Sequence, residues 1–109
     1  MMSLYEEYVL ERMNAKVIRN NNGFIVYRIK GEHGFIEELY IRFPMRKLGI
    51  ATDLADQVVN ICKENGCKYL QCSTDDRANG VEFSKIAILS YGFVKAQEDG
   101  SITRYIMEI

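Results

Sequence analysis

The 109-residue sequence has no tryptophan, a single proline and a single histidine. No uninterrupted apolar run is longer than four residues, as at 86–89, so we expect no membrane-spanning segment. The first seven residues carry acid where a secretory signal carries base, so we expect a cytoplasmic protein. The sequence contains no P-loop, no dinucleotide-binding glycine motif and no metal-spaced set of His, Cys and Asp, so we expect no metal site.

Cysteine is scarce, and its spacing fits no known framework. Cys62, Cys67 and Cys72 are an odd number of residues spaced by five, which matches neither paired disulfides nor a zinc site. We therefore expect reduced thiols that are buried or half-buried. One reactive thiol is the alternative, but Cys72 has no evident base because His33 lies in a turn far from it in sequence.

Neither sign of charge prevails. Lysine and arginine number 14 against 15 aspartate and glutamate, which gives a net charge of -1. A dedicated nucleic-acid binder needs clustered positive charge, so we expect no nucleic-acid partner. Hydrophobic residues make up 48% and charged residues 27% of the chain, which is the composition of an ordinary globule. At this length we expect one domain, residues 1–109.

The first half of the sequence predicts a helix followed by an antiparallel three-stranded meander. Ser3 and Glu6 form a capping box before apolar residues at helical spacing. Asparagine and glycine at 20–23 predict a turn, and a second turn is expected at 31–34. Residues around these turns alternate as in strands, at 17–18, 24–29 and 35–43.

The second half predicts two helices that alternate with strands. Apolar residues of 50–62 lie on one helical stripe, and Asn65–Gly66 is a typical end for that helix. A second apolar helix is expected at 81–90, ended by Gly92. The order α-β-β-β-α-β-α-β-β predicts an α/β fold with one mixed sheet. Its later strands are expected at 69–73, 93–96 and 102–109, with a turn at 98–101.

The stretch Leu39–Thr52 carries the strongest chemical signal. A strand is followed by a short loop with Arg46 and Lys47, and Gly49 then opens the long helix. The first amides of a helix have no internal partner and attract negative charge, and a glycine lets an oxygen-rich ligand approach the backbone. The two cations would add attraction for a pyrophosphate. The alternative is an ordinary strand-to-helix connection with a solvated basic pair.

The same stretch resembles the pyrophosphate signature of the GNAT superfamily of acyl-CoA N-acyltransferases. Residues 46–51, Arg-Lys-Leu-Gly-Ile-Ala, fit the pattern Q/R-x-x-G-x-G/A. The strand Leu39-Tyr40-Ile41 stands before it, and Pro44 lies in the loop between. Tyr91-Gly92-Phe93 resembles the Gly-Phe that closes the last helix of the family. The resemblance covers nearly the whole chain and implies the GNAT fold.

The resemblance implies acetyl-CoA as the acyl donor. The backbone at Leu39, Tyr40 and Ile41 would pair with the pantetheine arm as an added strand. An amide of Leu39 or Ile41 would polarise the thioester carbonyl. The pyrophosphate would lie on the backbone amides of Arg46, Lys47, Leu48, Gly49, Ile50, Ala51 and Thr52.

Transfer to an amine also needs a base, and the leaving thiolate needs a proton. Glu37 and Glu38 are expected to point to opposite faces of the sheet, with Glu37, slightly preferred as base, on the face of Leu39. A solvent-facing or ion-paired carboxylate is the alternative for each. Many members of the family place a tyrosine where this sequence has Ile88, so the candidates for the proton donor are Tyr91, a nearby serine or water.

The N-terminal part departs from the family. The usual order begins with a strand and two helices, whereas here one helix precedes the first strand pair, so we expect an open acceptor groove. Such a groove favours an amine on a peptide or protein; a small molecule, or a cover from the second subunit of a homodimer, is the alternative. We predict an N-acetyltransferase that acts by direct attack in a ternary complex. The competing functions are a non-catalytic module that binds CoA or a protein, and a small interaction domain without CoA.

Overall fold

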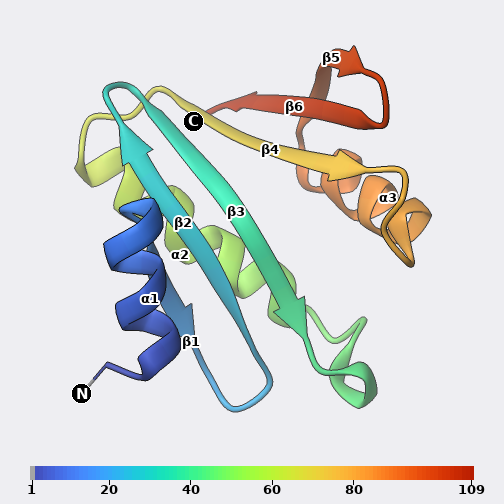
Figure 1. Ribbon diagram of the computed structural model, residues 1–109. Coiled ribbons are helices and arrows are strands. Elements are labelled where there is room, and N and C mark those ends of the chain that lie inside the picture. The colour runs from blue at the N-terminus through green and yellow to red at the C-terminus, as the bar shows by residue number, and fades with distance from the viewer. Residues whose placement is uncertain (1) are drawn as a thin grey trace.

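A computed structural model describes residues 2–109 of the chain. The elements are α1 (Leu4–Met13), β1 (Lys16–Arg19), β2 (Gly23–Lys30), β3 (His33–Ile41), the 3-10 helix η1 (Phe43–Met45), α2 (Ile50–Glu64), β4 (Tyr69–Asp75), α3 (Val81–Tyr91), β5 (Val94–Asp99) and β6 (Ile102–Glu108). The strands form one mixed sheet in the order β1-β2-β3-β4-β6-β5 (Figure 1). The predicted order of elements and the predicted α/β class with a mixed sheet are confirmed.

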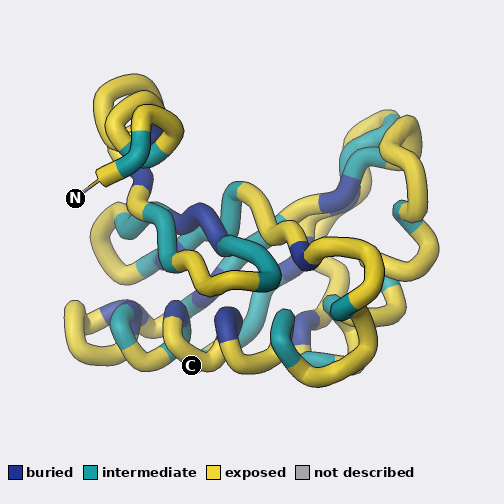
Figure 2. The backbone as a smooth tube through the Cα atoms, turned by 90° about the horizontal axis from the view of Figure 1, so that it is seen from below, coloured by how far each residue is buried: buried dark blue, intermediate teal, exposed yellow. Residues whose placement is uncertain are grey.

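The helices cover the two faces of the sheet unequally. α1 lies on one face, over β1 and β2, whereas α2 lies on the other (Figure 2). α3 lies on the side of α2, because Ile88 and Tyr91 pack against the core under that helix. The main core lies under α2, where Leu54 and Val58 pack with Ile25 and Leu70. A smaller cluster around Val9 lies under α1. The face of β3, β4 and β6 that points away from α2 and α3 therefore has no described helix over it.

The predicted cap and first turn are present. The hydroxyl of Ser3 accepts the amide of Glu6 at 3.2 Å, and the Glu6 carboxylate accepts the amide of Ser3 at 3.3 Å. The side chain of Asn20 accepts two amides of the turn that follows. β3 lies nearer the N-terminus than expected because the chain turns into η1 around Pro44. β5 runs through Asp99, which makes the last turn shorter than expected.

A β-bulge interrupts the pairing of β2 and β3. Val26 is opposite Glu38 but Tyr27 is opposite Ile36, so Glu37 has no partner on β2. An extra residue of this kind changes the alternation of side chains between the two faces of the strand. The sequence carries no signal for the bulge, since both glutamates continue an ordinary strand pattern.

The sheet opens between β3 and β4. These parallel strands pair only over three residue pairs, from His33 with Tyr69 to Phe35 with Gln71. Beyond those pairs the two strands diverge (Figure 1), and the bulge at Glu37 lies just past the end of the pairing. The facing edges of β3 and β4 are left without a strand partner there, which gives a ligand access to backbone groups.

α3 is an apolar helix with no buried residue. Phe83, Ile86 and Leu89 are exposed by 72%, 63% and 52%. The apolar pattern at 81–90 predicts the helix correctly, but it does not distinguish a buried face from an exposed one. Neither α3 nor any other described helix is long and apolar enough to cross a membrane.

Gly34 lies where β3 crosses α2, and we expect it to tolerate no side chain. A Cβ built there would lie 2.4 Å from Sγ of Cys62 and 3.1 Å from Cδ1 of Leu70. Gly34→Ala should lower the free energy of unfolding by about 1–3 kcal/mol, because an added methyl group overpacks this part of the core. Urea unfolding measures the loss. Cys62→Ala in the same chain should recover part of it, and an equal loss in both backgrounds would contradict the contact.

Candidate active site

The divergence of β3 and β4 leaves a cavity of about 730 Å³. Its walls are the open edges of the two strands, the start of α2 and the inner side of α3. This volume lies in the range of small-molecule and cofactor sites. Six of the predicted site residues line the cavity: Glu37, Glu38, Leu39, Ala51, Thr52 and Tyr91.

A row of unpaired backbone amides marks the start of α2. Gly49 is the N-cap residue, has a φ of 80° and provides no side-chain cap. Within the described chain, the amides of residues 47–52 donate to no carbonyl and no side chain, and Asp53 makes the first helical hydrogen bond, to Gly49 O at 3.0 Å. Free amides at the positive end of a helix dipole bind anions. The loop therefore fits a pyrophosphate by its own geometry.

The two cations of this loop are held differently. Nε of Arg46 donates to the carbonyl of Ile41 at 2.9 Å, and the guanidinium lies 5.9 Å and 5.6 Å from the ring centres of Tyr40 and Phe43. Arg46 thus ties the loop to the end of β3. Lys47 has a φ of 67°, a left-handed conformation that costs about 1–2 kcal/mol in a residue with a Cβ. Strained residues of this kind cluster at ligand-binding loops.

The open edge of β3 presents backbone groups to the cavity. The amide of Arg42 donates to Asn22 O at 2.8 Å, toward the turn between β1 and β2. Backbone groups of successive strand residues point to opposite edges, so Tyr40 directs its groups to β2, whereas Leu39 and Ile41 point away from it. Of the three strand residues predicted to bind the donor, Leu39 and Ile41 thus face the open edge. The carbonyl of Ile41 already accepts a hydrogen bond from Arg46. The amides of Leu39 and Ile41 donate to no described residue and are therefore available to a ligand.

The bulge places the two candidate bases on the same side of the sheet. Tyr27 belongs to the core under α2, so its neighbour Arg28 points to the other face, where its Nε donates to Oε1 of Glu37 at 2.5 Å. Glu38 lies on that face too, because its Oε2 accepts the hydroxyl of Tyr5 from α1. The expectation that the two carboxylates point to opposite faces, with Glu37 on the face of Leu39, is wrong. The extra residue of the bulge changes the alternation on which it rested.

The two carboxylates differ in their partners. Glu37 is paired with a cation, Arg28, whose guanidinium also lies 4.1 Å from the ring centre of Phe35. Glu38 accepts from a neutral hydroxyl, and its Oε1 has no partner among the described residues. One carboxylate is thus neutralised by the protein, whereas the other has one oxygen without a partner in the described chain, and Glu38 is among the residues that line the cavity.

Tyr91 lines the cavity together with Ile88. The hydroxyl of Tyr91 donates to Oδ1 of Asp56 on α2 at 2.6 Å. Burial of the hydroxyl and its hydrogen bond to Asp56 raise the pKa of Tyr91 well above its ordinary value. The hydroxyl therefore keeps its proton at neutral pH, and it connects α3 to α2 beside the cavity.

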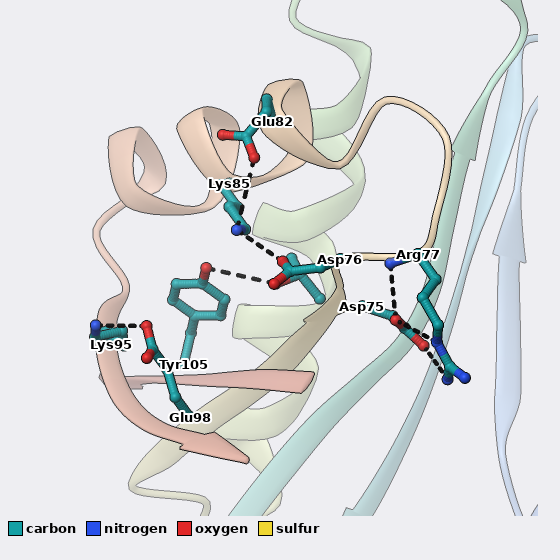
Figure 3. A network of polar contacts seen from close by, with 9 residues as sticks. Asp75, Asp76, Arg77, Glu82, Lys85, Lys95, Glu98 and Tyr105 are labelled. Carbon is teal, nitrogen blue, oxygen red and sulfur yellow. Dashed lines mark hydrogen bonds and ion pairs between the residues drawn. The ribbon is translucent and has the colours of Figure 1, made fainter. Parts of the chain in front are cut away.

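The loop after β4 borders the cavity and is held by ion pairs (Figure 3). Arg77 donates to both carboxylate oxygens of Asp75, at 3.0 and 2.7 Å, and holds the pKa of that carboxyl well below its usual range. Lys85 of α3 reaches Asp76 at 2.8 Å. Exposed pairs of this kind each contribute little to stability, but together they orient the loop that leads into α3.

Residues 5–83 match the family model described as the acetyltransferase (GNAT) family. This chain belongs to that family. The predicted GNAT membership is confirmed, and with it the predicted class of enzyme, an acyltransferase with acetyl-CoA as its donor. Among proteins with curated descriptions, none matches the sequence significantly.

Solved structures share the GNAT fold at low sequence identity. PaiA N-acetyltransferase from Thermoplasma acidophilum, in complex with coenzyme A, is 24% identical with a TM-score of 0.70; the match covers 81% of this chain and 54% of that one, so this chain spans about half of its length. An acetyltransferase from Thermus thermophilus is 14% identical, with a TM-score of 0.78 and coverage of 94% and 70%. The anti-CRISPR protein AcrVA5 is 20% identical, with a TM-score of 0.69 and coverage of 83% and 96%.

Three residues around the GNAT site were not expected from the sequence: Tyr5, Arg28 and Asp56. Tyr5 and Asp56 meet partners 33 and 35 residues away, and no local pattern signals such contacts. Arg28 lies nine residues from Glu37. The pair of Arg28 with Glu37 does have a sequence signal, because the two residues carry opposite charges on neighbouring strands of an expected hairpin.

The thiols of this GNAT chain are buried or half-buried, as expected. Cys72 lines the cavity, and burial raises its pKa to about 12, so the thiol stays protonated. His33 bonds through Nδ1 to the side chain of Gln71 at 2.8 Å. Since Gln71 and Cys72 are successive residues of β4, they point to opposite faces, and the imidazole does not reach the thiol.

Cys72→Ala should therefore keep turnover within about threefold of the unmodified GNAT protein, because a protonated thiol is a poor nucleophile. Thiol release from acetyl-CoA measures turnover, and mass spectrometry of the quenched reaction detects any acetylated enzyme. Acetylation of Cys72 in the unmodified protein, or loss of activity in the variant, would contradict direct transfer.

Proposed function

We propose that this protein transfers an acetyl group from acetyl-CoA to a primary amine by direct attack, without a covalent enzyme intermediate. The observation that carries the proposal is the cavity between β3 and β4. Leu39, whose amide is free, Ala51 and Thr52, which carry two of the unpaired amides at the start of α2, and Glu38, which no described cation neutralises, all line it. Groups suited to bind the donor and a group suited to activate the acceptor thus lie around one space.

The donor-binding residues are proposed to act through their backbone. The amides of residues 47–52 would hold the pyrophosphate, with Arg46 fixing the loop and adding charge. The amides of Leu39 and Ile41 would pair with the pantetheine arm, and one of them would donate to the carbonyl oxygen as negative charge develops on it. Acetyl-CoA supplies the thioester whose carbonyl carbon is attacked.

Glu38 is proposed as the base. An amine with a pKa near 10.4 is only about 0.1% neutral at pH 7.4, so a base must remove its proton. Glu38 would take that proton directly or through a water, as the nitrogen–carbon bond forms and the carbon–sulfur bond breaks. Glu37 is less suited because it already forms an ion pair with Arg28, and a neighbouring cation makes a carboxylate a weaker base.

Water is proposed as the proton source for the leaving thiolate. Tyr91 borders the cavity, but its hydroxyl is directed to Asp56 and not to a leaving group in the cavity. A thiolate with an ordinary pKa takes up a proton from the solvent once it has left. We assign Tyr91 the role of fixing α3 against α2, which maintains the shape of the cavity.

The acceptor is proposed to be an amine on a peptide or protein. The sheet face that carries Glu37 and Glu38 is open beyond α1, and Phe35 and Tyr69 are only half-buried. An extended segment can lie across such a surface, whereas a small molecule binds best in an enclosed pocket.

The alternative cover for this face is a second copy of the chain, and light scattering tests for such a homodimer. The three free thiols support a reducing, cytoplasmic location.

A module that binds CoA without catalysis is the second candidate. It is favoured by Ile88, which stands where many family members have a tyrosine, and by the hydrogen bond that directs the Tyr91 hydroxyl to Asp56. Both features remove a side-chain proton donor from the cavity, so they weaken the case for turnover without weakening the case for donor binding.

Thermal melting and thiol release separate the two candidates. Acetyl-CoA at one hundred times its Kd should stabilise the fold by about 2.7 kcal/mol. Release of CoA thiol that depends on an amine or a lysine-containing peptide identifies the enzyme. A shift in melting temperature without thiol release from any amine identifies the binding module. Absence of a shift with both acetyl-CoA and CoA would contradict both candidates.

A further inference from the structure

The first turn of α1 reaches the candidate base through one side chain. Tyr5 donates its hydroxyl to Oε2 of Glu38, 33 residues further along the chain. We propose that Tyr5 is a positioning residue for Glu38, which holds one carboxylate oxygen so that the other faces the attacking amine. The inference rests on the proposed function, in which Glu38 is the base, and adds the group that orients it.

Tyr5 is itself held from two directions. Its ring meets Phe24 of β2 edge-on, with 5.7 Å between ring centres, and Phe24 lies 5.8 Å from the ring of Tyr40 on β3. The turn that carries Tyr5 is closed by the capping box, and Glu6 of that turn pairs with Arg19 of β1 at 2.9 Å. The hydroxyl is therefore fixed relative to the sheet.

Tyr5 remains a hydrogen-bond donor over any ordinary working pH. Its bond to Glu38, followed by burial and the charge of that carboxylate, raises the pKa of Tyr5 to about 12. No cation among the described residues pairs with Glu38. Other charged groups at the cavity and beside it have partners of their own: Glu37 with Arg28, Asp75 with Arg77, and Asp56 with Tyr91.

The orientation of this carboxylate matters because proton transfer depends on distance and direction. A misplacement of about 1 Å can cost about 10²-fold in rate. With Oε2 held by Tyr5, Oε1 has no partner within the described chain, and Glu38 borders the cavity. Removal of the hydroxyl alone leaves the ring and its packing on Phe24 in place, so the effect should fall on kcat.

Tyr5→Phe tests the inference. The kcat for an amine acceptor should fall about tenfold, whereas the Kd for acetyl-CoA and the melting temperature should stay unchanged. Tyr8→Phe is the matched control, because Tyr8 lies on the next turn of α1, is 55% exposed and makes no side-chain hydrogen bond to a described residue. It should keep the unmodified kcat. A Tyr5→Phe protein with unmodified kcat overturns the inference.

A double-mutant cycle separates positioning from general damage. In a Glu38→Gln background, Tyr5→Phe should cause no further loss of kcat, because the oxygen that it orients no longer acts as a base. A further independent loss in that background overturns the inference and indicates a structural role. Failure of the proposed function looks different: absence of thiol release from the unmodified protein, or full turnover by Glu38→Gln, overturns the base assignment and the positioning role with it.

Discussion

Replacing Gly49 with valine should weaken acetyl-CoA binding by at least about 100-fold while the protein stays folded. Gly49 has a φ of 80°, which a β-branched residue adopts only under strain. The space around a Cβ built there is open, with no other atom within 4 Å, so the new side chain would stand beside the unpaired amides of α2. A ligand would then be kept from those amides. Isothermal titration calorimetry with acetyl-CoA measures the loss.

Gly66→Val is the matched control for this substitution. Gly66 has a φ of 81° and equally open surroundings, but it lies past the other end of α2. Both variants carry similar backbone strain, about 1–2 kcal/mol, so their melting temperatures should fall alike. Only Gly49→Val should lose the ligand. Unchanged affinity in Gly49→Val, or an equal loss in both variants, would place the pyrophosphate elsewhere.

Glu38→Gln should lower kcat by about 10²–10⁴-fold, the usual contribution of a general base. Glutamine keeps the shape of the side chain and still accepts the Tyr5 hydroxyl, but it cannot take a proton from the amine. Donor binding should be unchanged, because the proposed donor contacts are backbone amides. Thiol release at saturating acetyl-CoA, followed over a range of pH, measures the effect.

Glu37→Gln is the comparison that decides between the two carboxylates. It should change kcat by less than about threefold and lower the free energy of unfolding by less than about 1 kcal/mol, since its pair with Arg28 is partly exposed. A larger loss of kcat in Glu37→Gln than in Glu38→Gln would reverse the two roles.

Features of this protein that depend on neighbouring residues could be predicted from the sequence. The capping box of Ser3 and Glu6 needs two side chains three residues apart, and both are visible in the sequence. The helix that opens at Gly49 and ends at Asn65 follows from its apolar stripe and its terminal residues. The row of unpaired amides at residues 47–52 was predictable for the same reason, because it belongs to the start of one helix.

Features that depend on how distant segments meet could not be predicted. At Glu37 the pairing of β2 and β3 changes register, and the resulting bulge places both glutamates on one face of the sheet, against the expected alternation. The contact of Tyr5 with Glu38 requires α1 to lie over the face of the sheet to which Glu38 points. The hydrogen bond of Arg46 to the Ile41 carbonyl likewise follows from the path of the loop, whereas the sequence showed only that its charge could attract a pyrophosphate.

The short pairing of β3 with β4 gives the molecule a seam. Only three residue pairs of the described sheet join its first half, β1 to β3, to its second half, β4 to β6. A donor that bonds to the free amides of β3 would take the place of a neighbouring strand and would stabilise this part of the sheet. Amide exchange along β3 past Phe35 should therefore slow when the donor is bound, while exchange in the middle of α2 changes little.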